Sequence, residues 1–282
     1  MPYIKSDCKH KSVKMQTATN GLSPEIFPAV TALAGAAGES ILAIYQAPES
    51  ALLAQKADDT PLTQADLAAH RIIARGLQAL TPEIPVVSEE DEGSLVFRKA
   101  EGTFWLVDPL DGTKEFLARN GEFTVNIALV SEGETLWGVV LAPALGLTFW
   151  GGRGLGAFMD QGQGAASLPQ ASQAAGPVRV VASKSHLNEA TLQFIDALGP
   201  HELVQAGSSL KFCRLAQGQA ELYPRLSPTS EWDTAAAQAV LEGAGGQVVT
   251  LQGVPLRYGK ADLINPSFVA VAPHYKGRGS PC

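Results

Sequence analysis

Apolar positions in the N-terminal part of the chain recur with a helical period. Between residues 24 and 46 they return every three or four positions, and Pro48 ends the run because proline cannot continue a helix. The same period returns in residues 63–80, where Thr63 is predicted as the N-cap and Asp66 takes the place of the usual Glu of a capping box. The pattern therefore predicts two amphipathic helices at the start of the fold.

Beyond Pro82 the pattern changes to short runs rich in β-branched and aromatic residues, which predicts strands. The predicted strands of this part are 84–88, 103–107, 123–130, 135–141 and 147–150. Residues 161–177 are rich in Gly, Ala, Ser, Gln and Pro and show no period, so we expect them to separate two lobes.

Strand-like and helical runs alternate after this segment, which is typical of an α/β arrangement. The predicted strands are 178–182, 203–205, 247–251 and 268–271, and the predicted helices are 187–198, 209–217 and 234–243. We therefore expect an α/β (α+β) protein with an N-terminal α+β lobe over 24–160 and a C-terminal α/β lobe over 177–272. Residues 1–23 and 273–282 are expected to be tails, the first of them disordered.

Composition and charge narrow the possible partners. With 28 Asp and Glu against 21 Lys and Arg, the 282-residue chain has a formal charge of -7 and lacks the basic field that binds nucleic acid. No apolar run approaches the roughly 20 residues that span a bilayer, and no apolar segment follows the lysines of the N-terminal tail to make a secretory signal. Three cysteines, two of them near the termini, indicate a reducing compartment. We expect a cytoplasmic monomer or homodimer, with peripheral association of the lysine-containing tail with the inner membrane left open.

Two aspartates frame a proline-containing turn in the sequence Trp-Leu-Val-Asp-Pro-Leu-Asp-Gly-Thr. This turn can aim Asp108, Asp111 and the carbonyl oxygen of Leu110 at one point. The N–H groups of Gly112 and Thr113 would then face an anion. Because an all-oxygen ligand set suits magnesium or manganese better than zinc, a cation and a phosphate are expected side by side. This combination favours phosphoryl transfer to water.

More carboxylates extend this pattern. Glu89 and Glu90 follow a predicted strand, and Asp233 lies near a predicted helix start. An isolated D-x-x-D motif would more often consist of turn residues, and residues 89–92 would more often be a solvated acidic loop. The whole set instead favours a hydrolase that uses no covalent nucleophile.

Two segments, Asp-Pro-Leu-Asp-Gly-Thr at 108–113 and Trp-Asp-Thr-Ala-Ala at 232–236, resemble the two signature motifs of the inositol monophosphatase superfamily. Within this superfamily of lithium-sensitive, magnesium-dependent phosphatases, the chain is most similar to bacterial 3'(2'),5'-bisphosphate nucleotidases of the CysQ type. The segments that carry this similarity are 56–63, 108–116, 120–129 and 207–213. The resemblance covers about residues 24–271 and implies a layered α/β/α/β/α sugar-phosphatase fold with the active site between the two lobes.

The resemblance also implies roles for individual residues. Five groups match magnesium ligands, with Asp108 bridging two ions: Glu89, Asp108, the carbonyl oxygen of Leu110, Asp111 and Asp233. Asp58 and Thr113 match the pair that orients and deprotonates the attacking water, and Glu89 completes the catalytic set. A Thr hydroxyl cannot act as a base near neutral pH, so Asp58 is expected to accept the proton. Two or three Mg²⁺ ions are expected, Mn²⁺ is expected to substitute for them, and Li⁺ and Ca²⁺ are expected to inhibit. Glu90 either supports Glu89 and its metal or is simply the next exposed acid.

Substrate contacts are expected mainly in the second lobe. By resemblance Ser183 and His186 contact a nucleotide, although a lone His is more often structural. Gly207, Ser208 and Lys211 form a Gly-Ser turn that opens a helix, with a cation one turn later that suits a second phosphate. The complete predicted set is Glu89, Asp111, Gly112, Thr113, Lys114, Ser183, His186, Gly207, Ser208, Lys211, Arg225 and Asp233.

Arg225 is a further phosphate-clamp candidate, with Tyr223 expected near a base or ribose. Lys211 and Arg225 favour a bisphosphate over an inositol monophosphate, unless either pairs with Glu221 or Glu231 instead. We therefore expect hydrolysis of adenosine 3',5'-bisphosphate, and also of 3'-phosphoadenylyl sulfate, in connection with sulfate assimilation. The alternatives are an inositol monophosphatase or related sugar phosphatase, and a silent regulatory protein that binds magnesium and phosphate.

Overall fold

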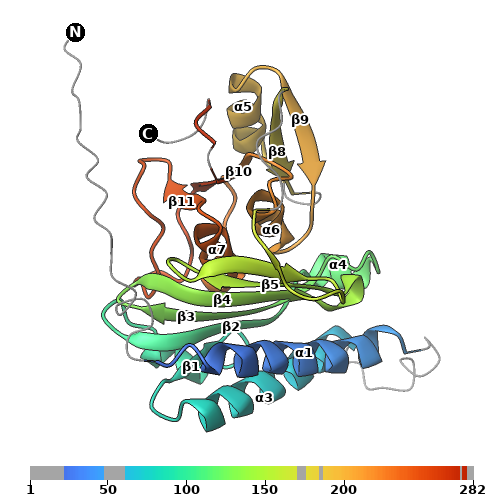
Figure 1. The fold of residues 1–282 in the computed structure, drawn as a ribbon, viewed down its shortest axis with the longest axis vertical. Helices are drawn as coiled ribbons and strands as arrows, with labels where there is room; N and C mark the ends of the chain where they lie inside the picture. Colours follow the sequence, from blue (N-terminus) through green and yellow to red (C-terminus); the bar gives the residue numbers. More distant parts are fainter. Residues whose placement is uncertain (1–21, 48–60, 170–175, 184–186, 274, 278–282) are drawn as a thin grey trace.

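The computed structural model describes residues 22–47, 61–169, 176–183, 187–273 and 275–277. Its elements form five layers, which are a helix pair, a sheet, a second helix pair, a second sheet and an outer helix (Figure 1). The helices of these layers are α1 (Ile26–Tyr45) with α3 (Pro61–Leu80), α6 (Leu210–Ala216) with α7 (Trp232–Gly243), and α5 (Glu189–Ala197). The expected α/β/α/β/α architecture is therefore confirmed.

Helix α1 has the length and mean hydropathy of a membrane-spanning segment, although Glu39 and Ser40 interrupt its apolar positions. Its alanine-rich sequence buries one face against the first sheet and α3, with Val30, Ala37 and Ile41 fully enclosed. A core helix meets the same test of length and composition, and the packing of α1 accounts for its apolar character.

Helix α3 begins at Pro61, before the predicted N-cap Thr63. Proline is favoured in the first helical turn because its fixed φ suits the helix and its missing N–H has no partner there. The predicted capping role of Thr63 and Asp66 is therefore wrong, and Asp66 lies inside the helix.

The first sheet runs in the order β1 to β7 and is an antiparallel meander except for the parallel pair β1 and β2. Its strands are β1 (Val86–Ser88), β2 (Thr103–Asp111), β3 (Thr124–Ser131), β4 (Glu134–Ala142), β5 (Leu147–Gly152), β6 (Gly156–Asp160) and β7 (Ala166–Ser167). The first five strands were predicted within a few residues. β6 and β7 were missed because they are short and lie among glycines that interrupt any period. β3 is buried on both faces, since α1 covers one and α7 the other.

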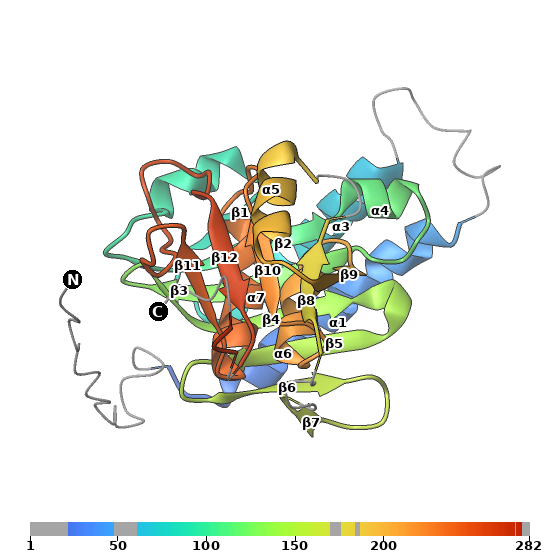
Figure 2. The ribbon, with the colours of Figure 1, turned by 90° about the horizontal axis from the view of Figure 1, so that it is seen from above.

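The second sheet has the order β11-β12-β10-β8-β9 and covers the middle of the first sheet when seen from above (Figure 2). Its strands are β8 (Val178–Ala182), β9 (His201–Gln205), β10 (Leu222–Arg225), β11 (Gln247–Thr250) and β12 (Phe268–Val271). The central strand β10 was not predicted, because Pro224 argues against a sheet interior. Proline is accommodated because β10 pairs with β8 only at Leu222.

Helix α7 joins the two sheets. It packs on β3, β4 and β5 of the first sheet and on β11 of the second. Gly138 of β4 permits this approach, since a Cβ there would lie 2.5 Å from the carbonyl oxygen of Ala236. The division into two lobes at residues 161–177 stays a prediction, because one core extends across both sheets.

Candidate active site

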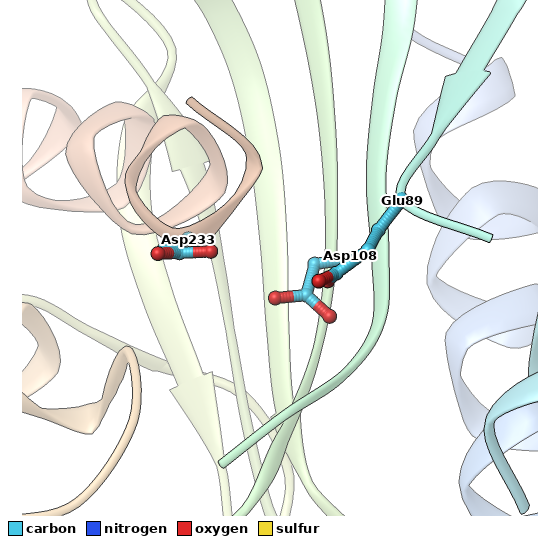
Figure 3. A group of neighbouring side chains, drawn as sticks. All are labelled: Glu89, Asp108 and Asp233. Atoms are coloured by element: carbon cyan, nitrogen blue, oxygen red, sulfur yellow. The ribbon is translucent and has the colours of Figure 1, made fainter. Parts of the chain in front are cut away.

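Three carboxylates from distant parts of the chain meet where β1 ends and α7 begins (Figure 3). Glu89 follows β1, Asp108 lies in β2 and Asp233 lies in the first turn of α7. Parallel pairing of β1 with β2 brings Glu89 beside Asp108, and the packing of α7 on the first sheet adds Asp233. One oxygen from each carboxylate lies within 4.8 Å of the others.

Asp111 extends this group through an irregular part of β2. The pairing with β3 shifts between Asp108 and Asp111, and the Leu110 N–H donates to Asp108 Oδ1 at 3.1 Å. Ser209 Oγ lies 3.1 Å from Asp111 Oδ2 and 2.8 Å from the carbonyl oxygen of Asp233. The Ser209 hydroxyl therefore links the two aspartates, a role not predicted from the sequence although the residue lies in the Gly-Ser-Ser turn.

A buried network holds the segment that carries Asp233. The Ser230 N–H donates to Asp233 Oδ2 at 2.8 Å. Glu231 is fully buried and pairs with Arg98, at 3.2 Å, and with Lys260. Because Arg98 follows the 3-10 helix after Glu89, this network ties together the two segments that carry metal-ligand candidates.

Removal from water raises the pKa of the four carboxyls of the acidic group, which are Glu89, Asp108, Asp111 and Asp233. Burial, followed by the charge of Asp111, raises the pKa of Asp233 to about 8. Desolvation raises the pKa of Glu89 to about 7 although part of its side chain is exposed, with added repulsion from Asp111 and Glu90. Burial also holds the pKa of Asp108 well above its ordinary value. A divalent cation would relieve this concentration of negative charge, and the oxygen donors suit a hard cation.

Asp66 faces the same group from α3. Burial, then the charges of Glu90 and Glu89, raises the pKa of Asp66 to about 8, and a hydrogen bond with Glu90 adds to the rise. Glu90 is half-buried, so this geometry favours a supporting role for Glu90 over that of a free exposed acid.

A cavity of about 380 Å³ opens beside Asp111 and Asp233. Most of the predicted substrate-binding residues line it, namely Asp111, Gly112, Thr113, Lys114, Ser183, Ser208, Lys211, Arg225 and Asp233. Gly207 adjoins it, but its N–H donates to Glu122 Oε2 at 2.9 Å. Asp58 and His186 lie outside the described residues. Lining residues not predicted from the sequence include Glu115, Phe212 and Thr229.

A model of the inositol monophosphatase family matches residues 22–277. The chain belongs to the inositol monophosphatase family. A relative from Salmonella typhimurium named 3'(2'),5'-bisphosphate nucleotidase CysQ is 46% identical over 240 residues, 85% of this chain and 96% of the relative. The protein of the same name from Escherichia coli K12 is 45% identical over 240 residues, with the same coverage. The crystal structure of CysQ from Bacteroides thetaiotaomicron has a TM-score of 0.79 at 40% identity and covers 88% of this chain and 97% of that one. The family and fold inferred from the motifs are thereby confirmed. The family is metal-dependent, and the acidic group could hold a metal ion.

Lys211 differs from an ordinary surface lysine, because it lines the cavity and is buried. Its residue is only 7% exposed, and its ammonium makes no hydrogen bond or ion pair with any described residue. It lies 5.8 Å from the centre of the Tyr223 ring. Burial lowers the pKa of Lys211 to about 8, and Asp111 opposes the shift. A positive charge in a buried residue with no hydrogen bond or ion pair among the described residues is suited to an anionic group of a ligand.

The alternative pairings of Lys211 and Arg225 with Glu221 or Glu231 are wrong. Glu221 pairs with Arg179, while Glu231 is held by Arg98 and Lys260 as described above. Arg225 donates to the carbonyl oxygens of Ser227 at 3.2 Å and Pro228 at 3.1 Å. Arg225 therefore shapes the loop between β10 and α7 as well as lining the cavity.

The metal-free protein is expected to lose stability as the pH rises from about 5 to about 8. In the unfolded chain Asp233 and Glu89 ionise near 3.8 and 4.5, but in the fold they hold protons up to about pH 8 and 7. Between these limits the folded state binds more protons than the unfolded state, so each rise in pH favours unfolding. Thermal unfolding in EDTA of the wild type and of Asp233→Asn will check this. The variant should gain stability relative to the wild type as the pH rises, whereas parallel profiles would contradict the assignment.

Gly112→Ala is expected to destabilise the protein more than Gly146→Ala. Both glycines have positive φ, 101° and 62°, so alanine at either position costs about 1–2 kcal/mol. A Cβ at Gly112 would also lie 2.1 Å from Ser208 Oγ, whereas no atom lies within 4 Å at Gly146. Urea unfolding of both variants separates the clash from the backbone strain. Equal losses would mean that Ser208 is free to move aside.

Proposed function

We propose that the protein is a magnesium-dependent phosphomonoesterase that hydrolyses adenosine 3',5'-bisphosphate to AMP and phosphate, and that also accepts 3'-phosphoadenylyl sulfate. The observation that carries this proposal is Lys211, a buried residue that lines the cavity beside the carboxylate group and whose ammonium has no hydrogen-bond or ion-pair partner among the described residues. A substrate with two phosphates would use both parts of the site. One phosphate would lie at the carboxylate group and its metal ions, and the other would lie at Lys211. The names of the CysQ relatives support this choice of substrate.

Glu89, Asp108, the carbonyl oxygen of Leu110, Asp111 and Asp233 would hold two or three Mg²⁺ ions. When bound, magnesium supplies positive charge at the phosphate and makes water more acidic. Thr113, which begins α4 (Thr113–Leu117) and lines the cavity, would hydrogen-bond the attacking water. Asp58, outside the described residues, would accept its proton. Mn²⁺ would substitute for Mg²⁺, and Li⁺ and Ca²⁺ would inhibit.

The 5'-phosphate would accept hydrogen bonds from Lys211. Tyr223 packs beneath the Lys211 ammonium, and Arg225 adds a second positive charge at the cavity wall. Ser208 donates its hydroxyl to the carbonyl oxygen of Asp111 at 3.0 Å, so it would shape the phosphate site without donating to the ligand. This activity would connect a cytoplasmic enzyme, monomeric or homodimeric, with sulfate assimilation.

Phosphate release from adenosine 3',5'-bisphosphate and from inositol 1-phosphate, measured side by side with and without Mg²⁺, tests the proposal. We expect magnesium-dependent release with a strong preference for the nucleotide. A preference for inositol phosphate would keep the metal site and overturn the role of Lys211. No release from either substrate would favour the silent binding protein.

A further inference from the structure

The strand next to the acidic group carries two polar side chains that make no hydrogen bond with any residue that the structure describes. Along β3, residues with odd numbers, such as Val125 and Ile127, enter the core beneath α1 and α3. Residues with even numbers face α7, and Ala128 and Val130 are part of the core there. Because side chains alternate along a strand, Thr124 and Asn126 lie on this α7-facing side.

Thr124 and Asn126 lie directly opposite the metal-ligand candidates of β2. Asn126 pairs with Asp108 and Thr124 pairs with Asp111 in the antiparallel register. Residues in such positions have Cβ atoms about 4.5–5.5 Å apart on the same face of the sheet. The two polar side chains of β3 therefore border two carboxylates of the proposed metal site.

Both side chains are buried and unsatisfied. Thr124 is 0% and Asn126 is 1% exposed. The Thr124 hydroxyl and both polar atoms of the Asn126 amide make no hydrogen bond within the described part of the chain. Leaving such groups unpaired destabilises the fold, so an apolar residue would be favoured if packing alone decided these positions.

We propose that Asn126 and Thr124 are positioning residues that complete the hydrogen bonding around the bound cation. A bound magnesium ion would keep several of its waters, and neighbouring side chains would have to supply hydrogen-bond acceptors for them. Asn126 offers an acceptor and a donor and Thr124 a hydroxyl, next to Asp108 and Asp111. The inference rests on the metal site of the proposed function and assigns to it two residues that are not themselves ligands.

The experiment measures Mn²⁺ binding and metal-free stability in three variants. Asn126→Leu and Thr124→Val keep the side-chain volume but remove the hydrogen-bonding atoms. Thr135→Val is the matched control, because the Thr135 hydroxyl is also buried and unpartnered but lies on β4 opposite Val130. Free Mn²⁺ is followed by electron paramagnetic resonance, and unfolding is followed in EDTA.

We expect Asn126→Leu to bind Mn²⁺ at least about tenfold more weakly than the wild type. Thr124→Val should change binding in the same direction, and both metal-free variants should be as stable as the wild type or more so. Thr135→Val should bind Mn²⁺ like the wild type. Unchanged Mn²⁺ binding in Asn126→Leu overturns the proposal, and if that variant does not fold, unchanged binding in Thr124→Val does so. A wild type that binds no Mn²⁺ or Mg²⁺ would instead overturn the metal site itself, and the inference with it.

Discussion

Asp108→Asn is expected to lower turnover by about 10³-fold, equivalent to roughly 4 kcal/mol of transition-state stabilisation, and to raise the stability of the metal-free protein. Asp108 is 1% exposed and lies among Glu89, Asp111 and Asp233, whose charges oppose its ionisation. Asn keeps an oxygen that can accept the Leu110 N–H at the same position. The substitution therefore removes the charge of a candidate metal ligand but retains the local hydrogen bond.

Turnover at saturating Mg²⁺ and thermal unfolding in EDTA measure the two effects separately. Asp196→Asn is a suitable control, because this exposed aspartate on α5 takes no part in the acidic group and neither measurement should change. A variant of Asp108 that unfolds, or that loses stability without metal, would show that Asp108 serves the fold. Near-wild-type turnover would remove it from the catalytic site.

The ligand candidates that could be predicted from the sequence are those fixed by local chemistry. Asp108 and Asp111 flank Pro109 and Leu110 in the irregular end of β2, and Asp233 lies in the first turn of α7. Such positions depend on a few neighbouring residues, so the sequence alone indicates them. Local patterns also predicted the helices and strands, through the period of α1 and α3 and the apolar runs of the first sheet. The layered arrangement of these elements was inferred from the family resemblance instead.

The supporting residues depend on long-range geometry and could not be predicted in this way. In the sequence, Asp66 cannot be distinguished from an acid that caps a helix. Only the packing of α3 against β1 and β2 brings Asp66 close to Glu90. Asn126 and Thr124 acquire their place only when the register of β3 against β2 is known. Pro224 argues against a strand in the sequence of β10. Only the structure shows that β10 pairs with β8 at a single residue and can therefore contain a proline.

Lys211→Met is expected to raise KM for adenosine 3',5'-bisphosphate by about 10- to 100-fold, the range of a charge-assisted hydrogen bond of roughly 1.5–3 kcal/mol. Hydrolysis of adenosine 3'-monophosphate, which lacks the 5'-phosphate, should change far less. Met has a similar length and retains packing against Tyr223, so the loss is confined to the ammonium. Any effect of Lys211 on the charge of Asp111 acts on both substrates alike. The ratio of their kcat/KM values therefore isolates the proposed contact with the second phosphate.

Arg214→Met provides the matched control for net charge. Arg214 lies on the same helix, α6, but its guanidinium donates to Gln219 at 3.0 Å and does not line the cavity. Its replacement removes one positive charge without reaching the ligand, so the substrate ratio should stay at the wild-type value. If Lys211→Met lowers both activities equally, the ammonium acts through Asp111 and the metal group, and the second phosphate is bound elsewhere. If only the bisphosphate reaction suffers, the buried ammonium determines the choice between a bisphosphate and a monophosphate.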